Sequence, residues 1–291
     1  IRLSLVGSEM CIRDSMKAVQ IKSHFVIFFC LLSLMVHSQQ LATDFHGIKA
    51  LRKAYTYTNI KGIQACFGNP AGLTFTDRYV FNTSAENRFG LPELIAFQLA
   101  AAGPLDRYGH IGLVVSQFGN KHYVNMQSSL VFGRQLFKKL SVGIKFDWLN
   151  TRIEGHGKQN HFSFEVGLIS NITKELSVGI HVFSPYGMNF TDNRKIPTIM
   201  TIGLQYAISK LVQINFEIEK NTFHGARIKS SIDYKIKDYF HCSFGIFTES
   251  KASNLACGVE LIILKNSVLD LGITYNQLLG ISSGIGFEFK F

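Results

Sequence analysis

The chain of 291 residues has little charge, little proline and few cysteines. Charged residues make up 17% of it, below the roughly 25% that is usual in soluble domains, while 46% of its residues are hydrophobic. The five cysteines show no pairs at metal-ligand spacing, which argues against a zinc site. No solenoid-type repeat and no low-complexity run is present. Such a composition suits one large all-β domain or two smaller ones.

The chain also lacks any apolar run approaching eighteen residues after position 38, so the sequence offers no transmembrane helix there. Residues 1–15 resemble translated sequencing-adapter read-through, and a genuine short extension is the alternative. Residues 16–38 have the pattern of a signal peptide, with a positive start, an apolar stretch at 25–36 and small residues before Gln39. We therefore expect an exported protein whose mature part begins near Gln39.

Hydrophobic and polar residues alternate along most of the remaining chain. In one segment serine, glycine, lysine and aspartate separate five apolar residues that share a face: Leu140, Val142, Ile144, Phe146 and Trp148. The same period of two recurs in residues 176–182, 212–219, 228–236 and 269–276. This period predicts strands that have one apolar face and one polar face.

Two architectures share this pattern. A soluble β-sandwich turns the apolar face inward, whereas a membrane barrel turns it toward lipid. The alternating segments are longer than the roughly five or six residues of soluble strands and close to the roughly nine to eleven of a tilted spanning strand. Fourteen strands fit between residues 78 and 291, an even number, as a closed bacterial barrel requires. We therefore predict an all-β fold, a transmembrane antiparallel β-barrel of about fourteen strands.

The connections between the predicted strands alternate between short and long. The short ones contain lysine, as at Lys138 and Lys139, and the long ones include residues 151–160 and 185–196. Short turns of outer-membrane barrels face the periplasm and long loops face outward, so we expect a protein of the bacterial outer membrane. Its lysine-containing turns would meet lipid headgroups.

The last predicted strand alternates aromatic residues with charged or small ones. We expect these aromatic residues to form the signal that the outer-membrane assembly machinery reads: Phe287, Phe289 and Phe291. An ordinary soluble strand is the alternative interpretation of this pattern.

Residues 39–77 precede the first predicted strand and do not alternate. Asp44 is placed to cap a short helix that runs through about Arg52. The stretch GNPAGL that follows has a turn-forming Asn-Pro pair between two glycines. A plain surface loop is one interpretation of this stretch.

An NPAGL stretch between a short helix and the first strand resembles the N-terminal hatch of the FadL/TodX hydrophobic-compound transporters, which are fourteen-stranded barrels. Other stretches resemble a Bacteroidota branch of that superfamily, the PorV/PorQ group of the type IX secretion system: GIKAL, RFGLPEL, FGNKHY and KELSVGIHVFSP. The resemblance covers residues 44–291. It implies a hatch at 39–77 inside a barrel at 78–291, with a closing element at Asn69, Pro70, Ala71 and Gly72. A fourteen-stranded barrel is too wide for its own side chains to fill, so a hatch is also expected on steric grounds.

The polar faces of the predicted strands point into the lumen and carry many charges. We expect these charges to pair with one another and with Arg52 and Lys53 of the hatch. The lumen-facing candidates are Lys145, Asp147, Glu165, Glu217, Lys229, Asp233, Glu260, Asp270 and Glu288. Many other inward positions are glycine, which either leaves room for a hatch or ligand or eases the curvature of the barrel. No catalytic arrangement stands out, so we expect neither an enzyme nor a cofactor or metal site.

Two functions fit the sequence. The first is a plugged channel for uptake or passage of small hydrophobic compounds, with the hatch as its gate. The second is a non-transporting barrel that acts as an anchor or partner in protein secretion at the outer membrane. Expected partners are outer-membrane lipid, the assembly machinery, and either hydrophobic small molecules or secretion-system proteins. The formal net charge of +10 is dispersed over turn lysines, so nucleic acid is not an expected partner.

Overall fold

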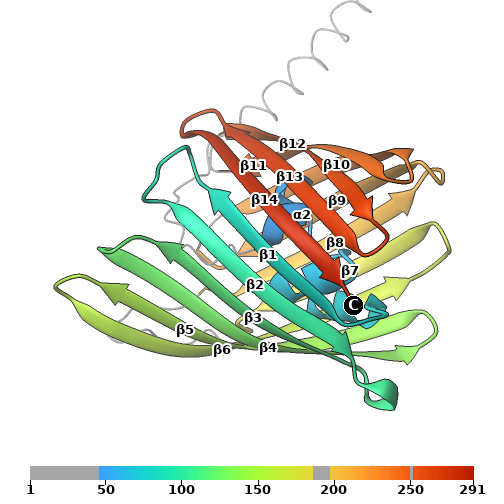
Figure 1. Ribbon diagram of the computed structural model, residues 1–291, viewed down its shortest axis with the longest axis horizontal. Helices are drawn as coiled ribbons and strands as arrows, with labels where there is room; N and C mark the ends of the chain where they lie inside the picture. The colour runs from blue at the N-terminus through green and yellow to red at the C-terminus, as the bar shows by residue number, and fades with distance from the viewer. Residues whose placement is uncertain (1–45, 186–196, 224, 250–251) are drawn as a thin grey trace, which may run out of the picture. The chain divides into compact units, whose positions relative to one another are not determined.

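The structure is a computed structural model that describes residues 46–185, 197–223, 225–249 and 252–291. The predicted signal peptide, the residues before it and Asp44 lie outside this part of the chain. The described residues form one closed antiparallel barrel with a short segment inside it (Figure 1).

Fourteen strands form the barrel wall. Each strand pairs with its neighbours in sequence, and β1 closes the ring by pairing with β14. The strands are β1 (Val80–Asn87), β2 (Ile95–Pro104), β3 (His110–Gly119), β4 (Tyr123–Phe137), β5 (Leu140–Ile153), β6 (Gly157–Asn171), β7 (Leu176–Phe183), β8 (Ile199–Ala207), β9 (Val212–Asn221), β10 (Ala226–Lys237), β11 (Phe240–Glu249), β12 (Ala252–Leu264), β13 (Ser267–Asn276) and β14 (Gly280–Lys290). The predicted number and order of strands are confirmed.

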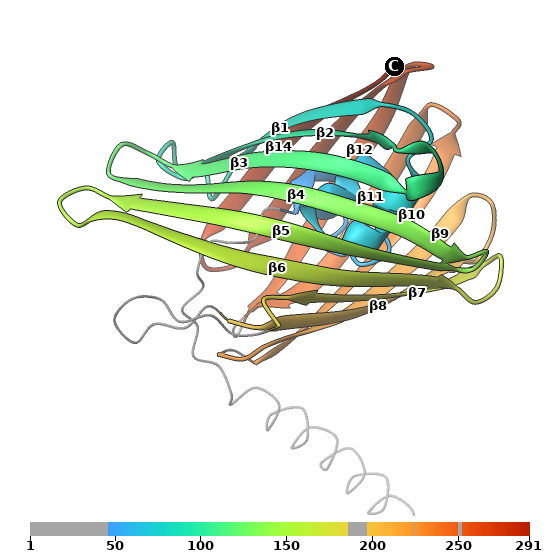
Figure 2. The ribbon, with the colours of Figure 1, turned by 90° about the horizontal axis from the view of Figure 1, so that it is seen from below.

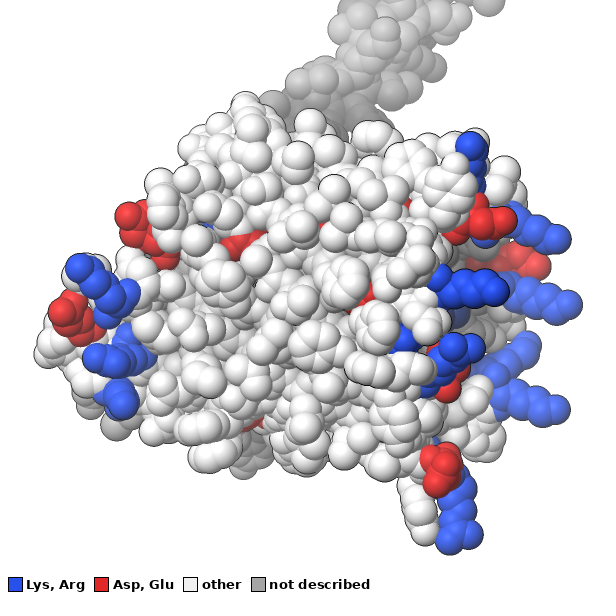
Figure 3. Space-filling view, viewed as in Figure 1, with Lys and Arg blue, Asp and Glu red and all other residues white. Residues whose placement is uncertain are grey.

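Successive side chains point alternately into the lumen and away from it. On β5, Lys145 and Asp147 are buried in the lumen, whereas Phe146 and Trp148 on the outer face are 54% and 46% exposed. Lys145 is in register with Glu165 of β6, so the polar faces of the two strands coincide. In Figure 3 the Lys, Arg, Asp and Glu side chains of the outer face gather mainly at its two ends, and large apolar side chains such as Phe146 and Trp148 are exposed between them. This arrangement is the reverse of a water-soluble barrel, which buries its apolar side chains inside.

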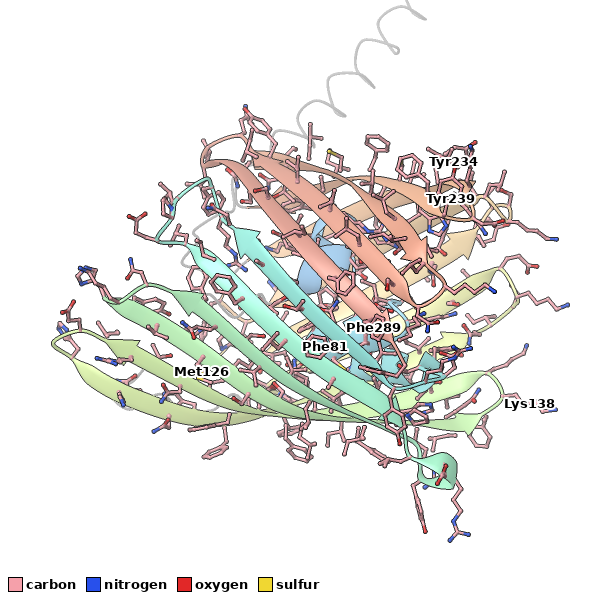
Figure 4. The ribbon with its side chains drawn as sticks, viewed as in Figure 1. Phe81, Met126, Lys138, Tyr234, Tyr239 and Phe289 are labelled. Carbon is pink, nitrogen blue, oxygen red and sulfur yellow. The ribbon has the colours of Figure 1, made fainter. Side chains whose placement is uncertain are left out.

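The two ends of the barrel differ in their connections. Short turns between β4 and β5, β10 and β11, and β12 and β13 gather at one end, which we call the turn end. Figure 4 shows Lys138 at the turn end, as well as Tyr234 and Tyr239. Lysine and arginine side chains crowd the turn end in Figure 3. We call the opposite end the loop end.

The prediction of a long loop at residues 151–160 is wrong. β5 continues to Ile153 and β6 begins at Gly157, so residues 154–156 alone connect the two strands. This extension pairs polar rows, such as Asn150 opposite Asn160, and therefore lacks the apolar alternation from which strand ends were predicted. Backbone groups still satisfy one another there without an apolar face. The hairpin of β5 and β6 projects beyond β7 at the loop end (Figure 2). Most of the loop expected at 185–196 lies outside the described residues.

Residues 46–75 form the segment inside the barrel, which we call the plug (Figure 2). It contains the helix α2 (Gly47–Leu51) and two 3-10 helices, η1 (Ile63–Phe67) and η2 (Pro70–Phe75). Helix α2 is shorter than the helix expected from Asp44, because the chain enters it through Gly47 with a φ of 76°. A further 3-10 helix, η3 (Asp106–Tyr108), lies in the turn between β2 and β3. Among the described residues, no helix has the length and apolar character to cross a membrane.

Candidate functional site

A buried arginine ties the plug to the barrel wall. Arg52 follows helix α2 and is only 2% exposed. Its Nε donates to Asp270 Oδ1 at 2.8 Å and its Nη2 donates to Glu260 Oε2 at 2.6 Å. Its Nη1 donates to Ser243 Oγ. These partners lie on β13, β12 and β11, so the rigid, planar donor set of one guanidinium joins three adjacent strands.

Two lysines of the plug flank this arginine. Lys49 Nζ lies 2.9 Å from Glu260 Oε2, and Lys53 Nζ lies 2.6 Å from Asp233 Oδ2. Burial opposes the charge on Lys49, but Glu260 and Asp270 hold the pKa of Lys49 above its ordinary value. Burial lowers the pKa of Lys53, although Asp233 opposes this shift. Three cations of the plug thus face three carboxylates of the wall, and the loss of Arg52 would leave the buried Asp270 without its ion-pair partner.

Asn69 joins the other end of the plug to the wall and is fully buried. Its side-chain oxygen accepts from the backbone N–H of Ala71 at 3.1 Å, which caps helix η2. Its Nδ2 lies 2.7 Å from the carbonyl oxygen of Thr58 within the plug. The same nitrogen lies 3.2 Å from the carbonyl oxygen of Leu168 on β6 and 3.3 Å from that of Ile180 on β7. One side chain therefore shapes the Asn-Pro turn and anchors it to two strands.

The inward glycines of the wall make room for the plug. A Cβ on Gly143 would overlap the carbonyl carbon of Pro70, and a Cβ on Gly167 would overlap Asn69 Oδ1. The glycines whose Cβ would fall within 3 Å of a plug atom are Gly112, Gly143, Gly167, Gly179, Gly203, Gly245, Gly258, Gly272 and Gly284. Of the two interpretations left open by the sequence, close approach of the plug accounts for these positions.

The middle of the plug meets a polar network on the wall. The backbone N–H and the hydroxyl of Thr58 both donate to Glu217 Oε1 at 2.6 Å. The ring of Tyr57 packs edge-on against His181 at a centroid distance of 5.4 Å. His181 Nε2 lies 2.8 Å from Glu165 Oε2. These contacts add a third point of attachment between the two ends of the plug.

All nine lumen-facing candidates lie on the inner face of the wall. Lys145 Nζ lies 2.9 Å from Glu165 Oε1, and Lys229 Nζ lies 2.6 Å from Glu219 Oε2. The expected pairing of Glu217 with a lysine is replaced by its hydrogen bonds to the plug. Asp233, Glu260 and Asp270 meet the plug cations, as described above.

Sequence reasoning missed several residues of the site: Lys49, Tyr57 and Thr58 of the plug, and His181 and Ser243 of the wall. The alternation of β7 placed His181 on the polar face, which was a usable signal. Tyr57 and Thr58 lie in a stretch without any period, so nothing in the sequence marked them.

Two cavities lie on either side of the plug. The cavity toward the loop end has a volume of about 70 Å³, and its lining mixes aromatic side chains such as Tyr55 with charged ones of both signs, such as Glu86 and Arg88. The cavity toward the turn end has a volume of about 440 Å³, and its lining includes Lys61 and Lys210. The plug therefore separates a small cavity from a larger one, and the linings of both mix acidic with basic side chains.

The described residues contain no group of three or more His, Cys, Asp or Glu side chains arranged to hold a metal ion. Cys66 is buried in the plug, and burial raises the pKa of its thiol well above the ordinary value. Cys242 and Cys257 are free thiols on β11 and β12.

No protein-family model and no curated protein matches the chain, but solved structures do. The toluene transporter TbuX of Ralstonia pickettii matches with a TM-score of 0.72 and 11% identity, over 86% of this chain and 99% of that one. The fold is similar to that of toluene transporters. The Pseudomonas putida transporter TodX matches with a TM-score of 0.69 and 13% identity, over 87% of this chain and 100% of that one. A Pseudomonas aeruginosa FadL homologue matches with a TM-score of 0.63 and 9% identity, over 88% of this chain and 100% of that one.

These three structures share the fold of the described chain, a fourteen-stranded barrel preceded by an N-terminal segment. They are transporters or a homologue of one, and none carries the name of an enzyme. The likeness concerns the fold, because the identities are low. The resemblance to the PorV/PorQ branch stays a prediction.

Proposed function

We propose that the protein is a plugged channel of the bacterial outer membrane that passes small hydrophobic compounds, with the plug as its gate. The observation that carries this proposal is the seating of residues 46–75 in the lumen. Buried ion pairs hold one end and Asn69 holds the other, while wall glycines receive its backbone. Such a segment blocks passage when it is seated and opens a path when it moves.

The outer face supports the membrane placement. An apolar band surrounds the barrel, and polar side chains fill its interior. Contact of this apolar face with lipid is favourable, whereas its exposure to water is not. The basic turn end suits anionic headgroups on the periplasmic side. The signal peptide predicted at residues 16–38 and the assembly signal predicted at Phe287, Phe289 and Phe291 agree with this placement.

The substrate class rests on two supports. The structures with a similar fold include transporters named for toluene. The lining of the loop-end cavity includes three aromatic side chains, Tyr55, Phe89 and Phe247, beside charged ones such as Glu86 and Arg88, and the aromatic side chains suit contact with an apolar compound.

A reversible crosslink tests the gate. Thr56 Oγ1 of the plug lies 3.0 Å from Ser231 Oγ of β10, so cysteines at these two positions are close enough for a disulfide. We would make the pair Thr56→Cys and Ser231→Cys in a chain whose Cys242 and Cys257 are serine. Proteoliposomes would then be assayed for entry of radiolabelled toluene. Oxidation should stop entry and reduction should restore it, because only the reduced plug can leave its seat.

Each single cysteine variant serves as the matched control and should pass toluene under both conditions. Equal toluene entry through the oxidised and reduced double variant would show that movement of the plug is not the gate.

A second candidate function is a non-transporting barrel that serves protein secretion, as in the PorV/PorQ group of Bacteroidota. The observation that favours it is the tight filling of the lumen, since most of the plug is buried. This function predicts no toluene entry in either redox state. It also predicts that the intact protein co-purifies with components of a secretion system.

A further inference from the structure

The outer wall of β5 and β6 carries an ordered ladder of side chains at the loop end. Three pairs of residues in register face outward there: Trp148 with Phe162, Asn150 with Asn160, and Arg152 with Lys158. Asn150 Nδ2 donates to Asn160 Oδ1 at 2.6 Å, so the middle pair is closed. The ladder therefore changes from aromatic to amide to cationic as it leaves the apolar band.

The outermost pair, Arg152 and Lys158, places two positive charges directly opposite each other. Like charges at facing positions of an antiparallel pair are destabilising. In the described part of the chain, neither Arg152 nor Lys158 has an ion pair or a side-chain hydrogen bond. The adjacent carboxylate of Glu154 is already paired with His122. The barrel itself therefore leaves this pair of cations without a counter-charge.

The height of the pair relative to the bilayer follows from strand geometry. Trp148 and Phe162 are large exposed aromatic side chains of the kind that lies at a membrane interface. Arg152 is four residues farther along β5, about 14 Å along the strand and about 10 Å along the barrel axis at a tilt of about 45°. The cations therefore lie at the level of headgroup phosphates when the aromatic pair lies at the edge of the hydrocarbon.

The neighbouring strand completes the site. Met126 and Val124 of β4 face Asn150 and Arg152 in register. Met126 is half-buried between the inward Asn125 and Gln127, so it lies on the outer face, and Figure 4 labels it toward the loop end of the barrel. An acyl chain beside this strand would contact apolar side chains below the cationic pair.

We propose that Arg152 and Lys158 bind a phosphate group of an anionic lipid in the outer leaflet. A phosphate monoester carries nearly two negative charges and several acceptor oxygens, so it neutralises both cations at once. Arginine binds such a group through two parallel hydrogen bonds, and lysine adds a point charge. The inference rests on the proposed placement in the outer membrane, and it concerns the wall of the barrel rather than its lumen.

The test uses the purified full chain in detergent and three probes: bis-phosphorylated lipid A, the same lipid without phosphates, and inorganic phosphate. Binding is measured by native mass spectrometry and by the shift of the melting temperature. The double variant Arg152→Gln/Lys158→Gln should bind phosphorylated lipid about 30-fold more weakly, which is the effect of two basic groups near an anionic surface. The matched control Lys138→Gln/Lys174→Gln removes the same charge at the turn end and should bind like the unmodified chain.

Three results would overturn the inference. These are equal binding of the lipid without phosphates, undiminished binding by the double variant, or full competition by inorganic phosphate at the lipid concentration. The last result would assign the site to a soluble anion. If the double variant does not fold, Arg152→Gln and Lys158→Gln are tested singly and should each show part of the loss. Toluene entry through the same double variant is measured in parallel. Weaker lipid binding together with normal toluene entry would show that the lipid site and the channel function are separate.

Discussion

Replacing Arg52 with alanine should release the plug while the barrel stays folded. The arginine lies on the plug, and its partners Asp270, Glu260 and Ser243 lie on the wall. The fourteen strands are hydrogen-bonded to one another without any contribution from the plug. The substitution therefore weakens the attachment of the plug to the wall and leaves the hydrogen bonds between the strands intact.

The size of the effect follows from the buried carboxylates. Removing one partner of a buried ion pair costs about 3–5 kcal/mol, because the remaining charge is left unpaired. Lys49 still pairs with Glu260, whereas Asp270 loses its 2.8 Å contact, so the lower end of this range applies. A cost of about 3 kcal/mol shifts the ratio of seated to released plug by roughly 100-fold or more.

Single-channel recording in planar bilayers measures this shift as the fraction of time spent open. The open fraction of the Arg52→Lys variant should fall between those of the unmodified protein and of Arg52→Ala, because one ammonium cannot replace a planar group that reaches three strands. Lys138→Gln, which removes a charge in an exposed turn, is the matched control and should record like the unmodified protein. An Arg52→Ala channel that stays closed as often as the unmodified one would refute this account of the ion-pair network.

Three further predictions concern other parts of the structure. Ile144→Arg should destabilise the barrel by about 2–4 kcal/mol, because it places a charge on the lipid face. Gly143→Ala should instead displace the plug and raise the single-channel conductance. If both variants lose heat resistance on gels to the same extent, the assignment of Ile144 to the outer face and Gly143 to the inner face is wrong. Asn69→Ala should raise conductance with little loss of barrel stability, because the Asn-Pro turn loses its wall contacts; unchanged conductance would show that this anchor is dispensable. Cys66 should resist maleimide at pH 8 in the folded chain, because burial raises its pKa, and should react in the Arg52→Ala variant; rapid labelling of the unmodified chain would mean that the plug is loosely seated.

The strands were predictable because a barrel wall imposes a local rule. Alternation between lipid and lumen repeats every two residues along the strands, with few exceptions such as Ser128, which lies opposite the outward Trp148. The rule fails at the loop end of β5 and β6, where the outward positions of the two strands are polar, as at Asn150 and Asn160. Strand length there is set by backbone pairing, which the side-chain pattern does not record.

The contacts of the plug were less predictable. Arg52 and Asp270 are 218 positions apart, and no local pattern says which of several inward carboxylates will meet a given cation. The same limit explains why Glu217 was expected to pair with lysine and instead accepts two hydrogen bonds from Thr58. Charge and inward direction were readable from the sequence, whereas the partner depends on how the plug is seated.

The central claim is that residues 46–75 close the pore. Its most direct test is the conductance of the barrel after these residues are deleted, recorded in planar bilayers beside the intact chain. The deletion should leave a folded, heat-resistant barrel, because the strands pair with one another, and its single-channel conductance should rise well above that of the intact protein. A folded deletion variant that conducts no more than the intact protein would contradict the claim that the plug is the gate.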